Sequence, residues 1–117
     1  MTRENYRKRG GIGPFVCHLC LCDEETINHL FAECEEALDI WEGVCSRINI
    51  ECSWEHLTVA ENLKAWFMLH PKEIAVPFIV LWGIWLHRTK ILFQGIRQEA
   101  GKVTVEIFKA LVEYKAD

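Results

Sequence analysis

The chain has 117 residues, of which 50% are apolar and 26% are charged. This length supports a single domain with one modest hydrophobic core, and this composition excludes a chain that stays disordered. The net charge of −4 is unevenly distributed, because residues 1–22 carry +3, residues 23–61 carry −10 and residues 62–117 carry +3. Nucleic-acid binders normally present a basic face, so only the two flanks of the chain suit phosphate contacts.

The N-terminus and the longest apolar stretch indicate in which cellular compartment the protein is expected. Charges and glycines fill residues 1–14, where a secretory signal would have its apolar segment. The longest apolar stretch, residues 74–86, is shorter than the roughly 20 residues of a membrane span, so it predicts a buried helix. We therefore expect an intracellular protein, nuclear or cytoplasmic, with no membrane partner. Disulfides rarely persist there, so the six cysteines favour metal binding or catalysis.

In chain order, the sequence predicts a basic arm, a Cys-rich loop and about four helices. Three glycines and Pro14 punctuate residues 1–16 and argue against regular structure in this arm. The Cys-rich loop covers residues 17–25. Apolar residues spaced by three and four then predict helices over residues 27–48, 58–69, 72–95 and 102–114. Since no segment alternates as a strand would, the expected fold class is mainly α.

The third predicted helix is the most apolar part of the chain. Its first half is apolar on nearly every side, which predicts a central core helix with Trp82 and Trp85 buried. Its second half is amphipathic and predicts exposed side chains for His87, Arg88 and Lys90. In the fourth helix, the same spacing places Val112 toward the core.

A metal-ligand pattern follows the arm. Cys17-x2-Cys20 forms a short hook that brings two sulfurs to one ion, and the later His29-x4-Cys34 pair supplies two more ligands. Three thiolates and one imidazole make a tetrahedral site with no open position, which is typical of structural zinc. The sequence therefore predicts Zn²⁺ bound by Cys17, Cys20, His29 and Cys34. Cys45 and Cys52 are expected to pack as small apolar groups.

The spacing between His29 and Cys34 does not suit two ligands of one ion on a regular α-helix. Five residues advance an ideal α-helix by about 140°, so these two side chains point in different directions along a regular helix. We therefore expect the helix to break or tighten near Cys34, with a second helix over residues 35–49. Other readings stay open: His18 or Cys22 could replace a ligand, or Cys34 could be a core residue of a continuous helix.

The residues around the hook resemble a known family. The run from Cys17 to Cys34, Cys-His-Leu-Cys-Leu-Cys-Asp-Glu-Glu-Thr-Ile-Asn-His-Leu-Phe-Ala-Glu-Cys, is similar to the zinc-binding domain of reverse transcriptases from plant non-LTR (LINE-type) retrotransposons. The basic residues 2–10 resemble the lead-in to that domain, and residues 81–90 resemble a Trp-rich segment that follows it. Two departures are Glu35, where the family often has Pro, and a start that suggests a domain truncated at its N-terminus.

The pattern along the chain predicts one domain in three parts: a basic Gly-containing arm (1–16), a zinc-binding segment with the first helix (17–50) and a helical segment packing on it (51–117). The resemblance implies non-specific binding of RNA or DNA. The basic residues suited to contact phosphates are Arg3, Arg7, Lys8, Arg9, Arg88 and Lys90.

Enzymatic activity is not expected. Polymerase and RNase H chemistry needs clustered carboxylates that hold two metal ions, and the aspartates here are only Asp23, Asp39 and Asp117. A Cys22 nucleophile paired with His18 or His56 has nothing else to support it, and no small-molecule substrate is expected. The alternatives to nucleic-acid binding are a protein-interaction module, with homo-oligomers formed through Trp66, Trp82 and Trp85, and a decayed element fragment without selected function.

Overall fold

The chain folds into helices and one cysteine-rich loop. The computed structural model describes residues 16–54 and 58–116. In these ranges it has one π-helix and four α-helices, and its only β feature is an isolated antiparallel bridge between Val16 and Glu24. The mainly α fold class predicted from the sequence is confirmed. The elements are η1 (His29–Glu33), α2 (Glu35–Arg47), α3 (Val59–Leu69), α4 (Ala75–Gln94) and α5 (Ala100–Ala116).

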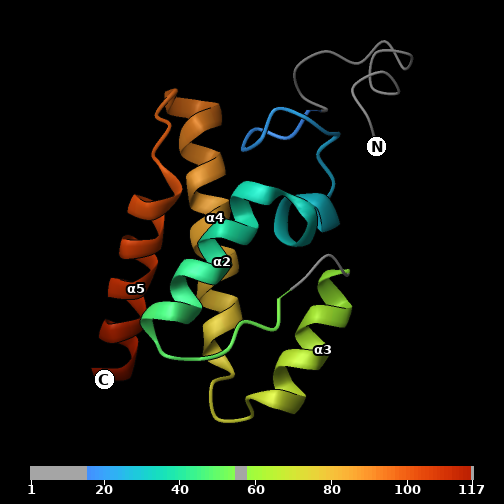
Figure 1. Ribbon diagram of the computed structural model, residues 1–117. Helices are drawn as coiled ribbons and strands as arrows, with labels where there is room; N and C mark the ends of the chain where they lie inside the picture. The colour runs from blue at the N-terminus through green and yellow to red at the C-terminus, as the bar shows by residue number, and fades with distance from the viewer. Residues whose placement is uncertain (1–15, 55–57, 117) are drawn as a thin grey trace.

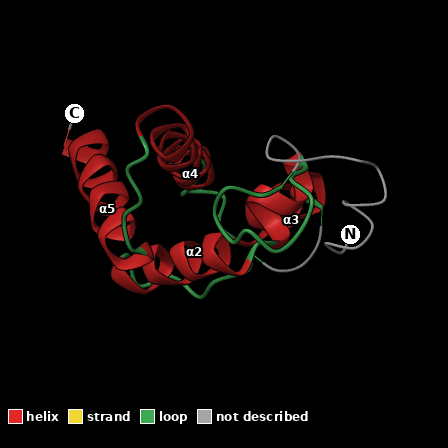
Figure 2. Cartoon of the chain, turned by 90° about the horizontal axis from the view of Figure 1, so that it is seen from above, coloured by secondary structure: helices red, strands yellow, loops and turns green. Residues whose placement is uncertain are grey.

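Helices α2, α4 and α5 pack together, while α3 lies on the other side of the molecule, in contact with η1 (Figures 1 and 2). Gly83 lets α4 approach α5 closely, because a Cβ at this position would lie 2.4 Å from Cγ1 of Ile107. Between these elements lies a continuous apolar core. Its largest fully buried side chains include Trp41, Trp66, Leu19, Ile40, Ile84 and Leu111.

The helix ends follow from local sequence. Helix α3 begins with a capping box, in which Thr58 and Glu61 satisfy each other's backbone N–H groups. It ends at Leu69, as predicted, because the residue before Pro71 is pushed out of helical geometry. Helix α4 ends at Gly95, whose φ of +66° is a left-handed conformation that glycine adopts at little cost.

The expectation that α4 is a central core helix is wrong. Only one of its faces is buried, and it includes Val76, Val80 and Ile84. Trp82 and Trp85, which were expected in the core, are 57% and 46% exposed. The physical reason is that α5 and α2 cover α4 on one side only, so an apolar surface remains on the opposite side.

Three further predictions of side-chain exposure are corrected. His87 is buried rather than exposed, because it lies on the face of α4 that packs against the rest of the molecule. Arg88 and Lys90 are half-buried rather than fully exposed. Val112 is half exposed on α5, where Leu111 takes the core position instead. By length and composition alone, α4 could also span a membrane, as could the core helices of many soluble proteins.

Candidate metal centre

The Cys17–Cys20 hook is a tight backbone turn. The N–H of Leu21 donates to the carbonyl of Cys17 at 2.9 Å, and the N–H of Cys17 donates to the carbonyl of Asp23 at 2.8 Å. Closing the turn places Leu21 at a φ of +58°, in the left-handed region that side chains other than glycine rarely adopt. The turn thus holds both cysteines of the hook at one end of the loop.

A π-helix and a break separate His29 from Cys34. The N–H of Cys34 donates to the carbonyl of His29 at 2.7 Å, which is the i→i+5 bond of a π-helix. Cys34 itself is extended, with a ψ of 125°, and α2 begins at Glu35. The expected interruption near Cys34 is confirmed, as is the restart of the helix at Glu35. The helix widens before it breaks rather than tightening, and α2 ends at Arg47 instead of residue 49.

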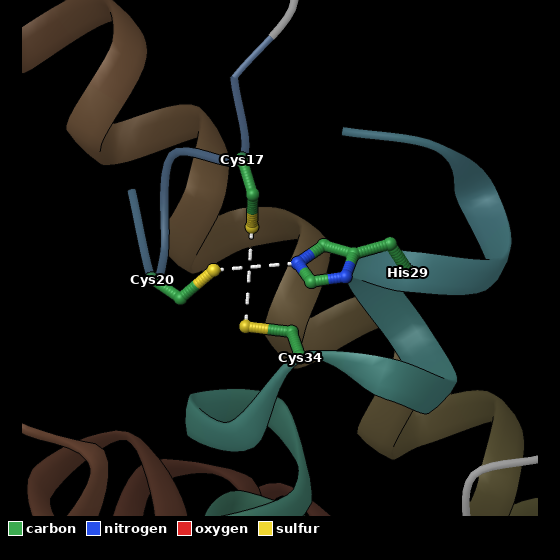
Figure 3. A group of neighbouring side chains, drawn as sticks. All are labelled: Cys17, Cys20, His29 and Cys34. Atoms are coloured by element: carbon green, nitrogen blue, oxygen red, sulfur yellow. Dashed lines mark hydrogen bonds between the residues drawn. The ribbon is translucent and has the colours of Figure 1, made fainter. Parts of the chain in front are cut away.

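These two backbone features bring the four predicted ligands together. One ligand atom from each of Cys17, Cys20, His29 and Cys34 lies within 4.8 Å of all the others. Figure 3 shows their side chains converging on one point from the hook and from the two ends of η1. Cys17 and Cys34 are fully buried, His29 is 6% exposed and Cys20 is half-buried.

The distances fit a tetrahedral ion. The sulfurs of Cys17 and Cys34 are 3.9 Å apart, and the Cys20 sulfur lies 3.3 Å from Nε2 of His29. With zinc–sulfur bonds of about 2.3 Å and zinc–nitrogen bonds of about 2.0 Å, a regular tetrahedron places such pairs about 3.8 and 3.5 Å apart. These two ligand pairs are therefore spaced as a single tetrahedral ion requires, and no two ligand atoms of the cluster are more than 4.8 Å apart.

The electrostatics of the cluster favour a cation. The hydrogen bond with Cys34 lowers the pKa of Cys17 to about 3, against the opposing effect of burial. The same hydrogen bond raises the pKa of the Cys34 thiol, because it stabilises the protonated form of Cys34 beside Cys17, and burial raises it as well. The hydrogen bond with Cys17 also raises the pKa of His29. A divalent cation would remove this conflict by stabilising all three thiolates at once.

Neighbouring groups orient the imidazole of His29. Its backbone N–H donates to the hydroxyl of Thr26 at 3.0 Å, so the start of η1 is fixed by a side chain. Because Nε2 faces Cys20, Nδ1 points away from the cluster and lies 3.9 Å from a carboxylate oxygen of Glu33. A carboxylate on the outer nitrogen is a frequent second-layer partner of metal-binding histidines.

Two arginines attach the Cys loop to the C-terminal half of the chain. Arg88 on α4 pairs with Glu25 at 2.7 Å, and Glu25 also accepts the backbone N–H of His18 at 3.1 Å. Arg97, in the segment after α4, donates to the carbonyls of His18 and Leu19 inside the hook. Sequence reasoning missed both arginines in this role, because their partners lie 63 to 79 residues away along the chain.

The other cysteines and histidines considered from the sequence lie outside the cluster. His18 is half-buried and Cys22 is exposed, and neither joins the group of four ligand atoms. Cys45 is buried, as expected for a small apolar group, whereas Cys52 is half-buried. Within the described ranges, no other group of three or more His, Cys, Asp or Glu side chains could hold a metal ion.

The predicted nucleic-acid contacts are only partly described. Arg3, Arg7, Lys8 and Arg9 lie outside the described residues, as does His56. Besides its ion pair with Glu25, Arg88 has its guanidinium 4.7 Å from the ring centroid of Trp85. Lys90 is half-buried on the same helix.

The comparisons with known proteins agree with the geometry of the cluster. Residues 1–41 match the family described as "zinc-binding in reverse transcriptase". This range contains all four residues of the cluster and supports a reverse-transcriptase zinc-binding domain in the N-terminal part of the chain. No curated protein and no solved structure matches the chain.

Proposed function

We propose that the chain is a non-enzymatic zinc module derived from a retrotransposon reverse transcriptase of the plant non-LTR type. Zinc is the ion that best suits three thiolates and one imidazole in a tetrahedron, since soft sulfur ligands select against Mg²⁺ and Ca²⁺. The description of the matching family also favours zinc. The proposed role of the ion is to hold the Cys loop against η1 and α2.

The observation that carries this proposal is that the cluster is closed. The cluster offers four ligand atoms, which would fill all four positions of a tetrahedral ion, and two of its three sulfurs are fully buried. A catalytic zinc ion keeps one position for water or substrate, whereas a structural zinc ion does not. The arrangement therefore supports a structural role for the ion.

Metal analysis combined with chelation tests the proposal. We expect one zinc ion per chain, with helicity and the cooperative unfolding transition lost when zinc is removed. Cys34→Ser should behave like the chelated protein, and Cys45→Ser, a buried cysteine outside the cluster, should keep its zinc. A folded protein purified without zinc, and indifferent to added zinc, would refute the structural role.

We further propose that the module assists non-specific binding of RNA or DNA through its basic arm. The support comes from the positive charge of residues 1–22 and from the family description. Because Arg88 already pairs with Glu25, we assign the phosphate contacts mainly to Arg3, Arg7, Lys8 and Arg9, and secondarily to Lys90. Binding of single-stranded RNA should weaken steeply with salt and fall when the four arm residues become Ala. RNA binding that is unchanged by salt and by the four Ala substitutions would refute the proposed nucleic-acid binding.

A protein-interaction role is the second candidate, and the exposed face of α4 favours it. Phe78, Trp82, Trp85 and Phe93 are 46 to 76% exposed on this helix. Exposed aromatic side chains in such number commonly mark an interface. Sedimentation at several protein concentrations tests for a homodimer through this face. Trp82→Ser with Trp85→Ser should shift any dimer to monomer, and a wild-type protein that is monomeric at all concentrations would exclude the dimer.

A further inference from the structure

A cavity between α4 and α5 is lined by a buried histidine whose ring nitrogens have no hydrogen-bond partner. The cavity has a volume of about 210 Å³ and is bounded mainly by apolar side chains of these two helices. His87, which is 2% exposed, forms part of its wall, and neither ring nitrogen has a hydrogen-bond partner. The apolar side chains that bound the cavity are Ile79, Trp82, Leu86, Val103, Ile107 and Ala110.

Neighbouring side chains do not satisfy His87. Nε2 lies 3.8 Å from a carboxylate oxygen of Glu36, which is too far for a hydrogen bond. A buried polar group left unpaired costs free energy, so a native structure normally provides it with a partner. In this protein a partner has room to enter, because the cavity adjoins the ring.

The imidazole is expected to be neutral. Burial lowers the pKa of His87, and the charges of Arg97 and Lys90 lower it further, against a smaller opposing effect of Glu106. A neutral imidazole presents one donor and one acceptor. A hydroxyl group can donate or accept, so it complements the ring in either tautomer.

The size and charge of the cavity narrow the choice of ligand. A dry cavity of about 150 Å³ is known to take up benzene, so about 210 Å³ has room for one aromatic ring with a small substituent. Lys90 and Glu106 both line the cavity, so its charged side chains balance and favour an uncharged ligand. Trp82 is 57% exposed and offers a ring against which an aromatic ligand can pack.

We propose that this α4–α5 cavity is a binding site for a small neutral phenol or similar monocyclic alcohol, whose hydroxyl bonds to His87. The site is separate from the metal cluster, because the two share no residue. Gly83 also lines the cavity and leaves room for Ile107 of α5, which a Cβ at position 83 would meet. The binding free energy would come from burial of the ring and from satisfying the imidazole.

Titration of the zinc-loaded protein with p-cresol, followed by NMR signals of the Ala110 methyl and the His87 ring, tests this proposal. Toluene is the matched control, because it has the same ring and methyl group without the hydroxyl. We expect p-cresol to bind about tenfold more tightly than toluene. No shift of these signals at millimolar p-cresol, or equal affinity for the two ligands, would overturn the proposal.

Three variants locate the site. His87→Leu should abolish the preference for p-cresol over toluene, whereas His70→Leu, which alters a half-buried histidine outside the cavity, should retain it. Ala110→Phe fills the cavity from α5, leaves His87 itself unchanged and should block both ligands. The preference surviving in His87→Leu, or undiminished binding in Ala110→Phe, would overturn the assignment. If His87→Leu fails to fold, the binding of both ligands to Ala110→Phe decides whether this cavity is the site.

Discussion

Trp41 and Trp54 stack with ring centroids 3.8 Å apart, and both indole N–H groups donate to the backbone carbonyl of Phe31. The two hydrogen bonds are 3.2 and 2.6 Å long. Phe31 lies in η1, between the ligands His29 and Cys34. Two core indoles from different segments thus anchor the turn that carries half of the metal cluster, so the core and the cluster should be energetically coupled.

Because the two indoles share one acceptor, the effects of their substitutions on the free energy of unfolding should not be additive. Trp41→Phe or Trp54→Phe alone leaves one indole on the Phe31 carbonyl, so each should cost about 1–2 kcal/mol of unfolding free energy. The double variant removes both donors and should cost about 1 kcal/mol more than the sum. Urea unfolding with saturating zinc measures this. Trp54→Phe with Trp66→Phe is the control, because Trp66 donates to the backbone carbonyl of Glu73 instead; equal coupling in both pairs would contradict the shared-acceptor account.

Leu21 predicts a stabilising substitution at the hook. Its φ of +58° costs an L side chain roughly 1–2 kcal/mol, whereas glycine adopts this conformation freely. Leu21→Gly should therefore raise the unfolding free energy by about 1 kcal/mol and tighten zinc binding. Asn49→Gly is the matched control, since Asn49 has a φ of +60° but asparagine tolerates it better. A loss of stability in Leu21→Gly would mean that the leucine side chain contributes more than its backbone strain costs.

Arg97 predicts that zinc affinity depends on the segment after α4. Its guanidinium donates to two carbonyls of the hook and is 40% exposed, so its contribution is discounted to about 1 kcal/mol. Arg97→Met should weaken zinc binding roughly fivefold in a competition with a chromophoric chelator, with helicity unchanged. Arg47→Met, at the exposed C-terminal end of α2, should leave the affinity as in the wild type. Equal affinities in all three proteins would show that Arg97 does not support the hook.

The sequence was most informative where spacing constrains geometry. The hook and the His29-x4-Cys34 pair are local motifs, so spacing alone groups their residues as ligands, and the folded chain brings them together. The clash between a five-residue spacing and the helical repeat required an interruption, which is present at Cys34 although Glu35 stands where the family often has Pro. The sequence also predicts four helices, because apolar periodicity is a local signal, and the described ranges contain four α-helices besides η1.

Sequence reasoning failed where the answer depends on distant partners. Helix α4 is apolar on nearly every side, so periodicity could not tell which face meets α5, and Trp82 and Trp85 were placed in the core wrongly. His87 was assigned to the surface by its polarity, although it belongs to the packed face. The pairing of Arg88 with Glu25 joins residues 63 positions apart, which no local pattern indicates.

The buried imidazole of His87 predicts a dependence of stability on pH. Because burial lowers its pKa in the folded state, the unfolded chain binds the proton more readily. Its stabilising contribution is therefore complete above the unfolded pKa of about 6.5 and is lost as the pH falls below it. Between pH 7.5 and 6.0, the wild type should lose more unfolding free energy than His87→Leu, with zinc saturating throughout. Parallel curves for the wild type and His87→Leu would contradict this account.

A closed site, in which one zinc ion is held by three sulfurs and one imidazole, underlies the proposed structural role. X-ray absorption at the zinc edge of the purified protein measures this ligand set. We expect three sulfur ligands at about 2.3 Å and one nitrogen at about 2.0 Å, with Cys20→Ser reducing the sulfur count to two. A spectrum of the wild-type protein with two sulfurs, or with an oxygen ligand from water, would contradict a closed site formed by Cys17, Cys20, His29 and Cys34.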